Sequence, residues 1–246
     1  MSKKKNESTK ESELFSLMKS HDNQVDNNYK ILPLGSRIIC FVGKKGSGKT
    51  SAMLSLLSNK KSPYHKYFDN IILCSPSAPH DDKLKDLYEE LSQEGKYFDS
   101  LTEKTAEEMK NLLIGLNDND KKDKKKIQNL LILDDVTQSF PTGRKPSQIS
   151  GLFTNSRHLK TTIWVVTHKY SSMPTLFRNQ LDCLFLYKTH SRNELESLKR
   201  DSNLDESFLE DAFKLATDEP YGFLYINNTS QIPRLYNKHF QEIVQE

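Results

Sequence analysis

The chain alternates short apolar runs with longer stretches of helical periodicity. The apolar runs are continuous rather than alternating apolar with polar, which is typical of strands buried on both faces of a parallel sheet. Five runs have this character, at residues 37–42, 70–74, 129–134, 162–167 and 182–187. The helical stretches between them cover residues 50–57, 82–91, 105–116 and 148–156. Strands that alternate with helices predict an α/β fold with a mainly parallel central sheet.

The two ends of the chain differ from this pattern. Residues 1–30 are rich in Lys, Ser, Asn and Asp, so we predict a flexible polar tail, whose short apolar stretch at 14–18 fits a docking helix. The remaining residues, 31–246, are within the ordinary size of one domain. Near the C-terminus, residues 221–226 and 232–236 flank an Asn-Asn-Thr-Ser cluster, which predicts a β-hairpin at the edge of the sheet.

A charged segment, residues 117–126, precedes the third apolar run and reads NDNDKKDKKK. Low-complexity charge of this kind favours a solvated connecting loop, which is our prediction. A loop that faces DNA is the alternative interpretation.

The composition limits the possible functions of the protein but does not indicate one. The formal net charge of +3 is too small to indicate nucleic-acid binding by bulk electrostatics, so any DNA contact would depend on local Lys and Arg side chains. Cys40, Cys74 and Cys183 all fall in predicted buried strands, and an odd count argues against a disulfide framework. The apolar runs are far shorter than the roughly 20 residues of a membrane span, and no signal-peptide pattern opens the chain. We expect a soluble, intracellular protein.

A glycine-rich segment at residues 43–50, GKKGSGKT, fits the pattern G-x4-G-K-[ST] between a predicted strand and a predicted helix. Glycines allow the backbone N–H groups to surround phosphates, and the helix N-terminus favours an anion. Lys49 is expected to reach the β- and γ-phosphates of ATP, and Thr50 to offer its hydroxyl to Mg²⁺. The alternative is a glycine-rich turn without a ligand, which the flanking strand and helix disfavour. The residues predicted to hold the nucleotide are Gly43, Lys44, Gly46, Ser47, Gly48, Lys49, Thr50 and Ser51.

Two carboxylates end the third apolar run, Leu-Leu-Ile-Leu-Asp134-Asp135. The carboxyl edge of a parallel sheet is where ligands bind in α/β folds. We therefore predict that Asp134 holds Mg²⁺ and that Asp135 orients and deprotonates the attacking water, which makes the reaction a hydrolysis. Helix capping is the alternative role for such a pair.

Further candidates lie around the next strand. Thr167 and His168 end this strand. Either would lie beside the γ-phosphate if the strand is inserted between the one before the glycine-rich loop and the one that ends in Asp134. For His168, the alternative is a helix cap or an exposed loop residue. A neighbouring subunit would have to supply an arginine to stabilise transition-state charge. Arg157 is our candidate, with Arg178 and Arg192 as alternatives, and a solvated or ion-paired side chain is the ordinary role of each.

In their order these residues resemble the FtsK/HerA superfamily of pumping ATPases, and within it the DNA-packaging ATPases of poxvirus-like viruses and virophages. The resemblance covers most of residues 36–240. Besides the phosphate loop and the Leu-Ile-Leu-Asp-Asp strand, it rests on Ser156-Arg157-His158, Val166-Thr167-His168, the stretch 174–182, Gly222-Phe223-Leu224-Tyr225 and Pro233-Arg234. It implies a RecA-like P-loop NTPase with helices on both faces of the sheet.

Two residues depart from the superfamily pattern. Many members carry Glu at the position of Asp135 and Gln at that of His168, and the membrane-anchoring segments of the cellular division translocases are missing, which favours the viral branch. The resemblance further implies a homo-oligomeric ring, a hexamer by family likeness, around double-stranded DNA. Lysines at 3–5, 44 and 121–126 could then touch DNA phosphates, and the tail at 1–30 could dock on capsid protein.

The sequence thus predicts an ATP-hydrolysing motor that packages a viral genome, acting in the host-cell cytoplasm, viral factory or virion. A replicative or recombination ring ATPase or helicase is the alternative. A nucleotide-dependent assembly module is the second alternative.

Overall fold

The computed structural model describes residues 31–123, 127–142, 147–189 and 191–245. The predicted tail at 1–30 therefore lies outside the described residues, as do the last three lysines of the charged segment. Within the described part nine strands form one sheet, in the order β3-β2-β4-β5-β1-β6-β7-β8-β9. The strands are β1 (Ile38–Val42), β2 (Asn70–Cys74), β3 (Tyr97–Phe98), β4 (Asn129–Asp134), β5 (Thr161–Thr167), β6 (Cys183–Tyr187), β7 (Phe223–Asn227), β8 (Arg234–Tyr236) and β9 (Glu242–Ile243).

In this order, every neighbouring pair from β3 to β6 is parallel, and the pairs β6–β7, β7–β8 and β8–β9 are antiparallel. Strand β5 lies between β4 and β1, with Asp134 beside Val166 and Val42 beside Thr167. The carboxyl ends of these three strands therefore meet at one edge. This is the insertion on which the predicted position of His168 depends, and it is confirmed.

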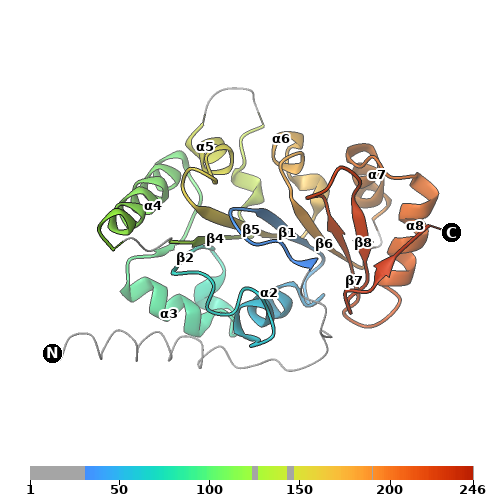
Figure 1. Ribbon diagram of the computed structural model, residues 1–246, viewed down its shortest axis with the longest axis horizontal. Coiled ribbons are helices and arrows are strands. Elements are labelled where there is room, and N and C mark those ends of the chain that lie inside the picture. Colours follow the sequence, from blue (N-terminus) through green and yellow to red (C-terminus); the bar gives the residue numbers. More distant parts are fainter. Residues whose placement is uncertain (1–30, 124–126, 143–146, 190, 246) are drawn as a thin grey trace.

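Helices cover both faces of the sheet (Figure 1). They are α2 (Lys49–Ser58), α3 (Lys85–Gln93), α4 (Glu103–Asp123), α5 (Gln148–Thr154), α6 (Thr175–Arg178), α7 (Arg192–Asp201) and α8 (Glu206–Ala216). Helices α2 and α3 lie on one face, and α4 to α8 on the other. The predicted mainly parallel α/β sheet with helices on both faces is confirmed.

The alternation of side chains along β5 shows why the apolar runs are continuous. Ile163 and Val165 belong to the buried cluster under α4 and α5, whereas Trp164 and Val166 belong to the cluster under α2. The Trp164 ring packs edge-on against that of Phe68, with centroids 5.9 Å apart. Because both faces of the strand are covered, every residue from 161 to 167 is buried.

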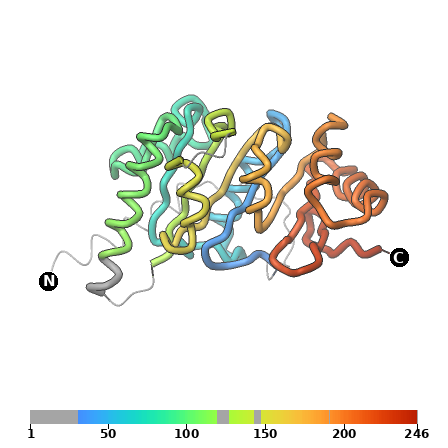
Figure 2. Tube along the Cα trace, turned by 90° about the horizontal axis from the view of Figure 1, so that it is seen from above, coloured from blue at the N-terminus to red at the C-terminus, as the bar shows by residue number. Residues whose placement is uncertain are grey.

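The C-terminal hairpin is also confirmed, with shifted bounds. Strand β7 begins at Phe223 rather than at residue 221, because Tyr221 and Gly222 form the turn that precedes it. Strand β8 begins at Arg234, and β9 adds a third antiparallel strand that was not predicted. Figure 2 shows this hairpin grouped with α7 and α8 at one end of the molecule, opposite α4.

The prediction of a charged loop at 117–126 is wrong for residues 117–123, which continue α4. Lysine is a good helix former, so a charged run need not interrupt a helix. Asn117 also fastens this part of α4 to the sheet, because its amide nitrogen donates to Leu159 O at 2.8 Å and its oxygen accepts from Asn129 at 3.1 Å. Residues 124–126 lie outside the described part.

Other differences are omissions. Helices α6, α7 and α8 and the two-residue strand β3 were not predicted, and α3 begins at Lys85, three residues later than expected. All three cysteines are free and buried, as expected of strand residues. In the part of the chain that the structure describes, no helix combines the length and apolar character that a membrane span needs.

Candidate nucleotide site

The glycine-rich loop joins β1 to α2 at the carboxyl edge of the sheet. Gly46 and Gly48 have φ angles of 79° and 100°, which residues with a side chain rarely adopt. A Cβ atom on Gly43 would lie 2.6 Å from both Ser47 Oγ and Tyr187 Cβ, so this position has no room for a side chain. The loop thus requires glycine at three places, as expected of a phosphate-binding backbone.

The Lys49 side chain turns back into the loop. Its Nζ donates to the carbonyl oxygens of Gly43 at 2.6 Å and Lys44 at 3.2 Å, and it lies 3.4 Å from Nδ1 of His168. Lys49 is only 6% exposed. Burial lowers the pKa of its ammonium group, against the opposing effect of Asp135 and Asp134. A phosphate would give this buried cation a stronger acceptor than carbonyl oxygens.

Asp134 is the buried carboxylate of the site, 5% exposed at the end of β4. Its Oδ2 accepts hydrogen bonds from Ser75 Oγ at 2.8 Å and Ser77 Oγ at 3.3 Å. Burial raises the pKa of the Asp134 carboxyl from 3.8 to about 6, and the charge of Asp135 adds to this, while the two serine hydroxyls oppose it. A cation at this carboxylate would offset the cost of its charge.

The following residue, Asp135, leaves the strand with φ of 54°, in the left-handed region that Asp adopts more readily than most residues. Its N–H donates to Val166 O at 3.0 Å, which fixes the carboxylate relative to β5. Asp135 Oδ2 lies 3.1 Å from Nε2 of His168. Asp135 is more exposed than Asp134, so a water molecule can reach it.

His168 bridges the two halves of the site. Its Nε2 faces Asp135, and its Nδ1 lies 3.3 Å from Gly43 O and 3.4 Å from Lys49 Nζ. The hydroxyl of Thr167 instead lies 3.1 Å from Thr137 Oγ1 in the buried interior. Of the two candidates for phosphate sensing, His168 is therefore the one whose side chain contacts the other site residues.

The oxygen ligands at this edge fit a magnesium ion. Mg²⁺ prefers carboxylate and hydroxyl oxygens and is usually bound through one or two carboxylates, with phosphates and waters completing its shell. Asp134 supplies a buried carboxylate whose pKa is raised by burial, and Thr50 stands in the first turn of α2. Among the described residues, no group of three or more His, Cys, Asp or Glu could hold a metal ion.

The remaining loop positions are divided between the solvent and local partners. Lys44 is exposed, and Ser51 Oγ accepts a hydrogen bond from Lys83 Nζ at 2.8 Å. Ser47 Oγ is buried and has no hydrogen-bond partner within the described chain. An unpartnered buried hydroxyl next to a glycine-rich loop is a free group for a bound phosphate.

The three candidate arginines lie in different places. Arg157 is exposed and precedes β5, so it lies at the edge of the sheet opposite the glycine-rich loop. Arg178 is committed to an ion pair with Asp201 at 3.0 Å and lies over the Tyr170 ring at 5.2 Å. Arg192 is exposed at the start of α7, which follows the carboxyl end of β6.

Two supports of the site were not found from the sequence. Ser75 and Ser77 follow β2 at the same edge, and polar residues directly after an apolar run were the available signal. Glu194 of α7 is 3% exposed and accepts hydrogen bonds from Tyr170 N, Ser171 N and Ser171 Oγ. It thereby holds the turn η4 (Tyr170–Ser172), two residues beyond His168.

Comparisons with known proteins show the family and the fold of the chain. A family model described as "Poxvirus A32 protein" matches residues 28–217. No match was found among curated protein sequences. Three similar solved structures are of proteins named B204.

B204 from Sulfolobus turreted icosahedral virus 2 in complex with AMPPCP has a TM-score of 0.57 and 18% identity, covering 85% of this chain and 98% of that chain. Its complex with ATP-gammaS has a TM-score of 0.56 and 20% identity, covering 81% and 96%. B204 from Sulfolobus turreted icosahedral virus, described as a DNA-packaging ATPase, has a TM-score of 0.53 and 19% identity, covering 85% and 98%. These likenesses show a shared fold, and because the family model spans most of the sequence, the chain belongs to the poxvirus A32 protein family.

Proposed function

We propose that this protein is an ATP-hydrolysing motor that drives double-stranded DNA into a viral capsid. The main support for ATPase activity is that Lys49, Asp134, Asp135 and His168 lie together at one edge of the parallel sheet. Membership of the poxvirus A32 family, and the fold shared with the genome packaging NTPase B204, support DNA packaging as the work to which hydrolysis is coupled.

Each residue has a role that follows from its position. The N–H groups of the loop and the ammonium group of Lys49 bind and orient the triphosphate. Thr50 and Asp134 would hold Mg²⁺, which neutralises phosphate charge when it is bound. Asp135 is placed to take the proton of the attacking water, because its carboxylate is reachable by solvent and oriented by His168. His168 contacts both the lysine and the base, so it can report whether the phosphate is present.

The proposal extends to assembly. A homo-oligomeric ring, a hexamer by family resemblance, would place the nucleotide between subunits. Arg157, exposed and at the edge away from its own loop, could then act only on the site of a neighbouring subunit. We also propose one ATPase domain in residues 31–246, a capsid-protein partner, and action in the host-cell cytoplasm, viral factory or virion.

The test is ATP hydrolysis by the purified full chain with no DNA, with linear duplex and with single strands, alongside the oligomeric state with an ATP analogue. We expect a ring on duplex DNA and faster hydrolysis with duplex than with single strands. Hydrolysis that is indifferent to every form of DNA would contradict the motor. Stimulation by single strands together with unwinding of forked DNA would instead identify a helicase.

A further inference from the structure

Tyr221 lies against the glycine-rich loop although it is far from it in the sequence. A Cβ atom on Gly48 would lie 3.3 Å from Cδ1 and 3.7 Å from Cβ of Tyr221. The ring therefore lies beside Gly48, the N-cap residue of α2. Tyr187 also approaches Gly48, with Cε1 at 3.7 Å, but it is only 1% exposed and belongs to the core.

Tyr221 is 72% exposed, so it adds little to the core. Its φ of 58° is unfavourable for a bulky residue, and a glycine would adopt this angle at no cost. A large aromatic residue kept exposed in a strained conformation indicates a use outside folding stability. Its position beside the loop indicates what that use is.

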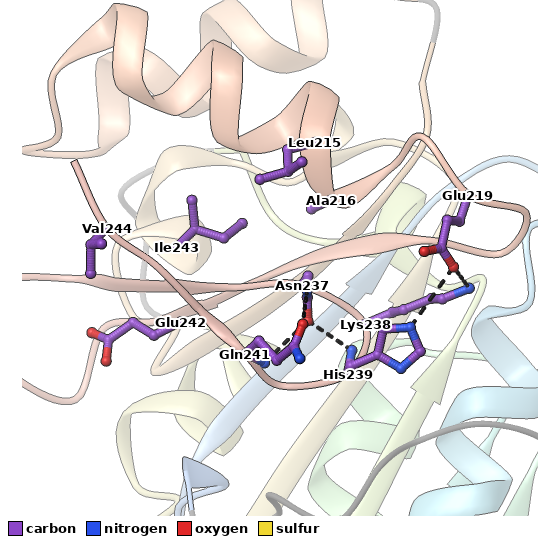
Figure 3. Close-up of a pocket in the computed structure, with 10 residues that line it drawn as sticks. All are labelled: Leu215, Ala216, Glu219, Asn237, Lys238, His239, Gln241, Glu242, Ile243 and Val244. Carbon is purple, nitrogen blue, oxygen red and sulfur yellow. Dashed lines mark hydrogen bonds and ion pairs between the residues drawn. The ribbon is translucent and has the colours of Figure 1, made fainter. Parts of the chain in front are cut away.

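The turn that carries Tyr221 is held in place from two sides. A Cβ atom on Gly222 would lie 2.6 Å from Ala216 O and 2.9 Å from Glu219 O, so only glycine fits at this position. Figure 3 shows Lys238 and His239 directed at Glu219, with which Lys238 forms an ion pair and His239 lies at 3.8 Å. The connection between β8 and β9 thus fixes the turn.

The order of the strands gives the direction of a bound nucleotide. Asp134, Asp135 and His168 follow β4 and β5, which lie on one side of β1. Strands β6 and β7 lie on its other side, and because Tyr187 pairs with Phe223, the turn with Tyr221 sits at the carboxyl end of β6. A triphosphate whose γ-phosphate meets Asp135 and His168 must extend its ribose and base toward the β6–β7 side.

We propose that Tyr221 is the platform on which the base of the bound nucleotide stacks. Aromatic stacking needs a π-face and an open approach, and the Tyr221 ring offers both beside the loop. This inference rests on the proposed function, since it takes the glycine-rich loop to hold the phosphates of that nucleotide.

The test compares two ligands that share phosphates but not a base, ATP and inorganic tripolyphosphate, each with Mg²⁺. Calorimetry on the full chain would measure both affinities for the wild type and for Tyr221→Ala, Tyr221→Phe and Tyr221→Gly. The glycine variant removes the ring and relieves the strained φ, so it stays informative even if the alanine variant folds poorly.

We expect Tyr221→Ala and Tyr221→Gly to weaken ATP binding about tenfold and to leave tripolyphosphate binding unchanged, with Tyr221→Phe within about twofold of the wild type. Unchanged ATP affinity in the alanine and glycine variants would overturn the platform, and so would an equal loss for both ligands. A wild-type chain that binds neither ligand would overturn the proposed function itself, which keeps the two failures apart.

Discussion

The two sides of the glycine-rich loop are built differently. On the β4–β5 side, charged groups are buried or partly buried and contact one another: Lys49 reaches His168, His168 reaches Asp135, and Asp134 is held by serine hydroxyls. On the β6–β7 side stands an exposed aromatic ring. The first arrangement suits chemistry, because preorganised charges act most strongly away from water. The second suits recognition of a flat group that must enter and leave.

The largest effect should come from the β4–β5 side, at Lys49. We expect Lys49→Ala to lower the rate of ATP hydrolysis by roughly a thousandfold or more, because it removes the buried cation that faces the phosphates. Steady-state hydrolysis measures this. Lys45→Ala is the matched control, since Lys45 is an exposed lysine of the same loop and should retain activity. If Lys49→Ala hydrolyses ATP at the wild-type rate, the reaction does not take place on the β4–β5 side.

Asp135→Asn should come next, with kcat lowered roughly 10² to 10⁴ fold and ATP binding little changed. Asparagine tolerates the φ of 54° at this position, so the backbone should keep its shape. Rapid-quench kinetics combined with calorimetry separates the two quantities. If ATP binding falls as much as kcat, the carboxylate serves binding rather than proton transfer.

A smaller effect is expected at Glu194, which touches no predicted ligand group but holds the turn beyond His168. Glu194→Ala leaves the N–H groups of Tyr170 and Ser171 without their acceptor, which should lower the free energy of unfolding by about 1–3 kcal/mol. Since His168 would be less well positioned, kcat should fall while KM changes little. Glu196→Ala, on the exposed side of the same helix, is the control. A change in KM alone would contradict a positioning role.

The smallest effect concerns the turn on the β6–β7 side. The hydrogen bond from Lys238 lowers the pKa of Glu219 below its ordinary 4.5, with a further contribution from the Lys238 charge. A carboxyl with a lowered pKa stabilises the folded state above its unfolded pKa and loses this contribution as the pH falls through its folded pKa. The wild type should therefore melt slightly above Glu219→Gln at neutral pH, and this difference should vanish well below pH 4.5. A difference that persists in acid would mean that the ion pair is not its source.

The sequence predicted the parallel strands well, and it marked residues that the structure brings together at one edge of the sheet, for identifiable reasons. Continuous apolar runs predicted β2 and β4 with their observed bounds. The glycine-rich loop and Asp134 stood out because glycines in this spacing, and a carboxylate at the end of an apolar strand, have few structural roles. Helix α8 was missed although Asp205, whose side chain accepts from Phe208 N, was a capping signal. The contacts of Ser75 with Asp134 and of Tyr221 with Gly48 join distant parts of the chain, so local pattern could not give them.

Both outer strands of the sheet, β3 and β9, are only two residues long. A strand this short leaves few unpaired N–H and C=O groups for another chain to extend. Copies of this protein are therefore poorly suited to join by continuing one sheet into the next. In the ring proposed above, the subunits would then meet through surfaces other than the edges of their sheets.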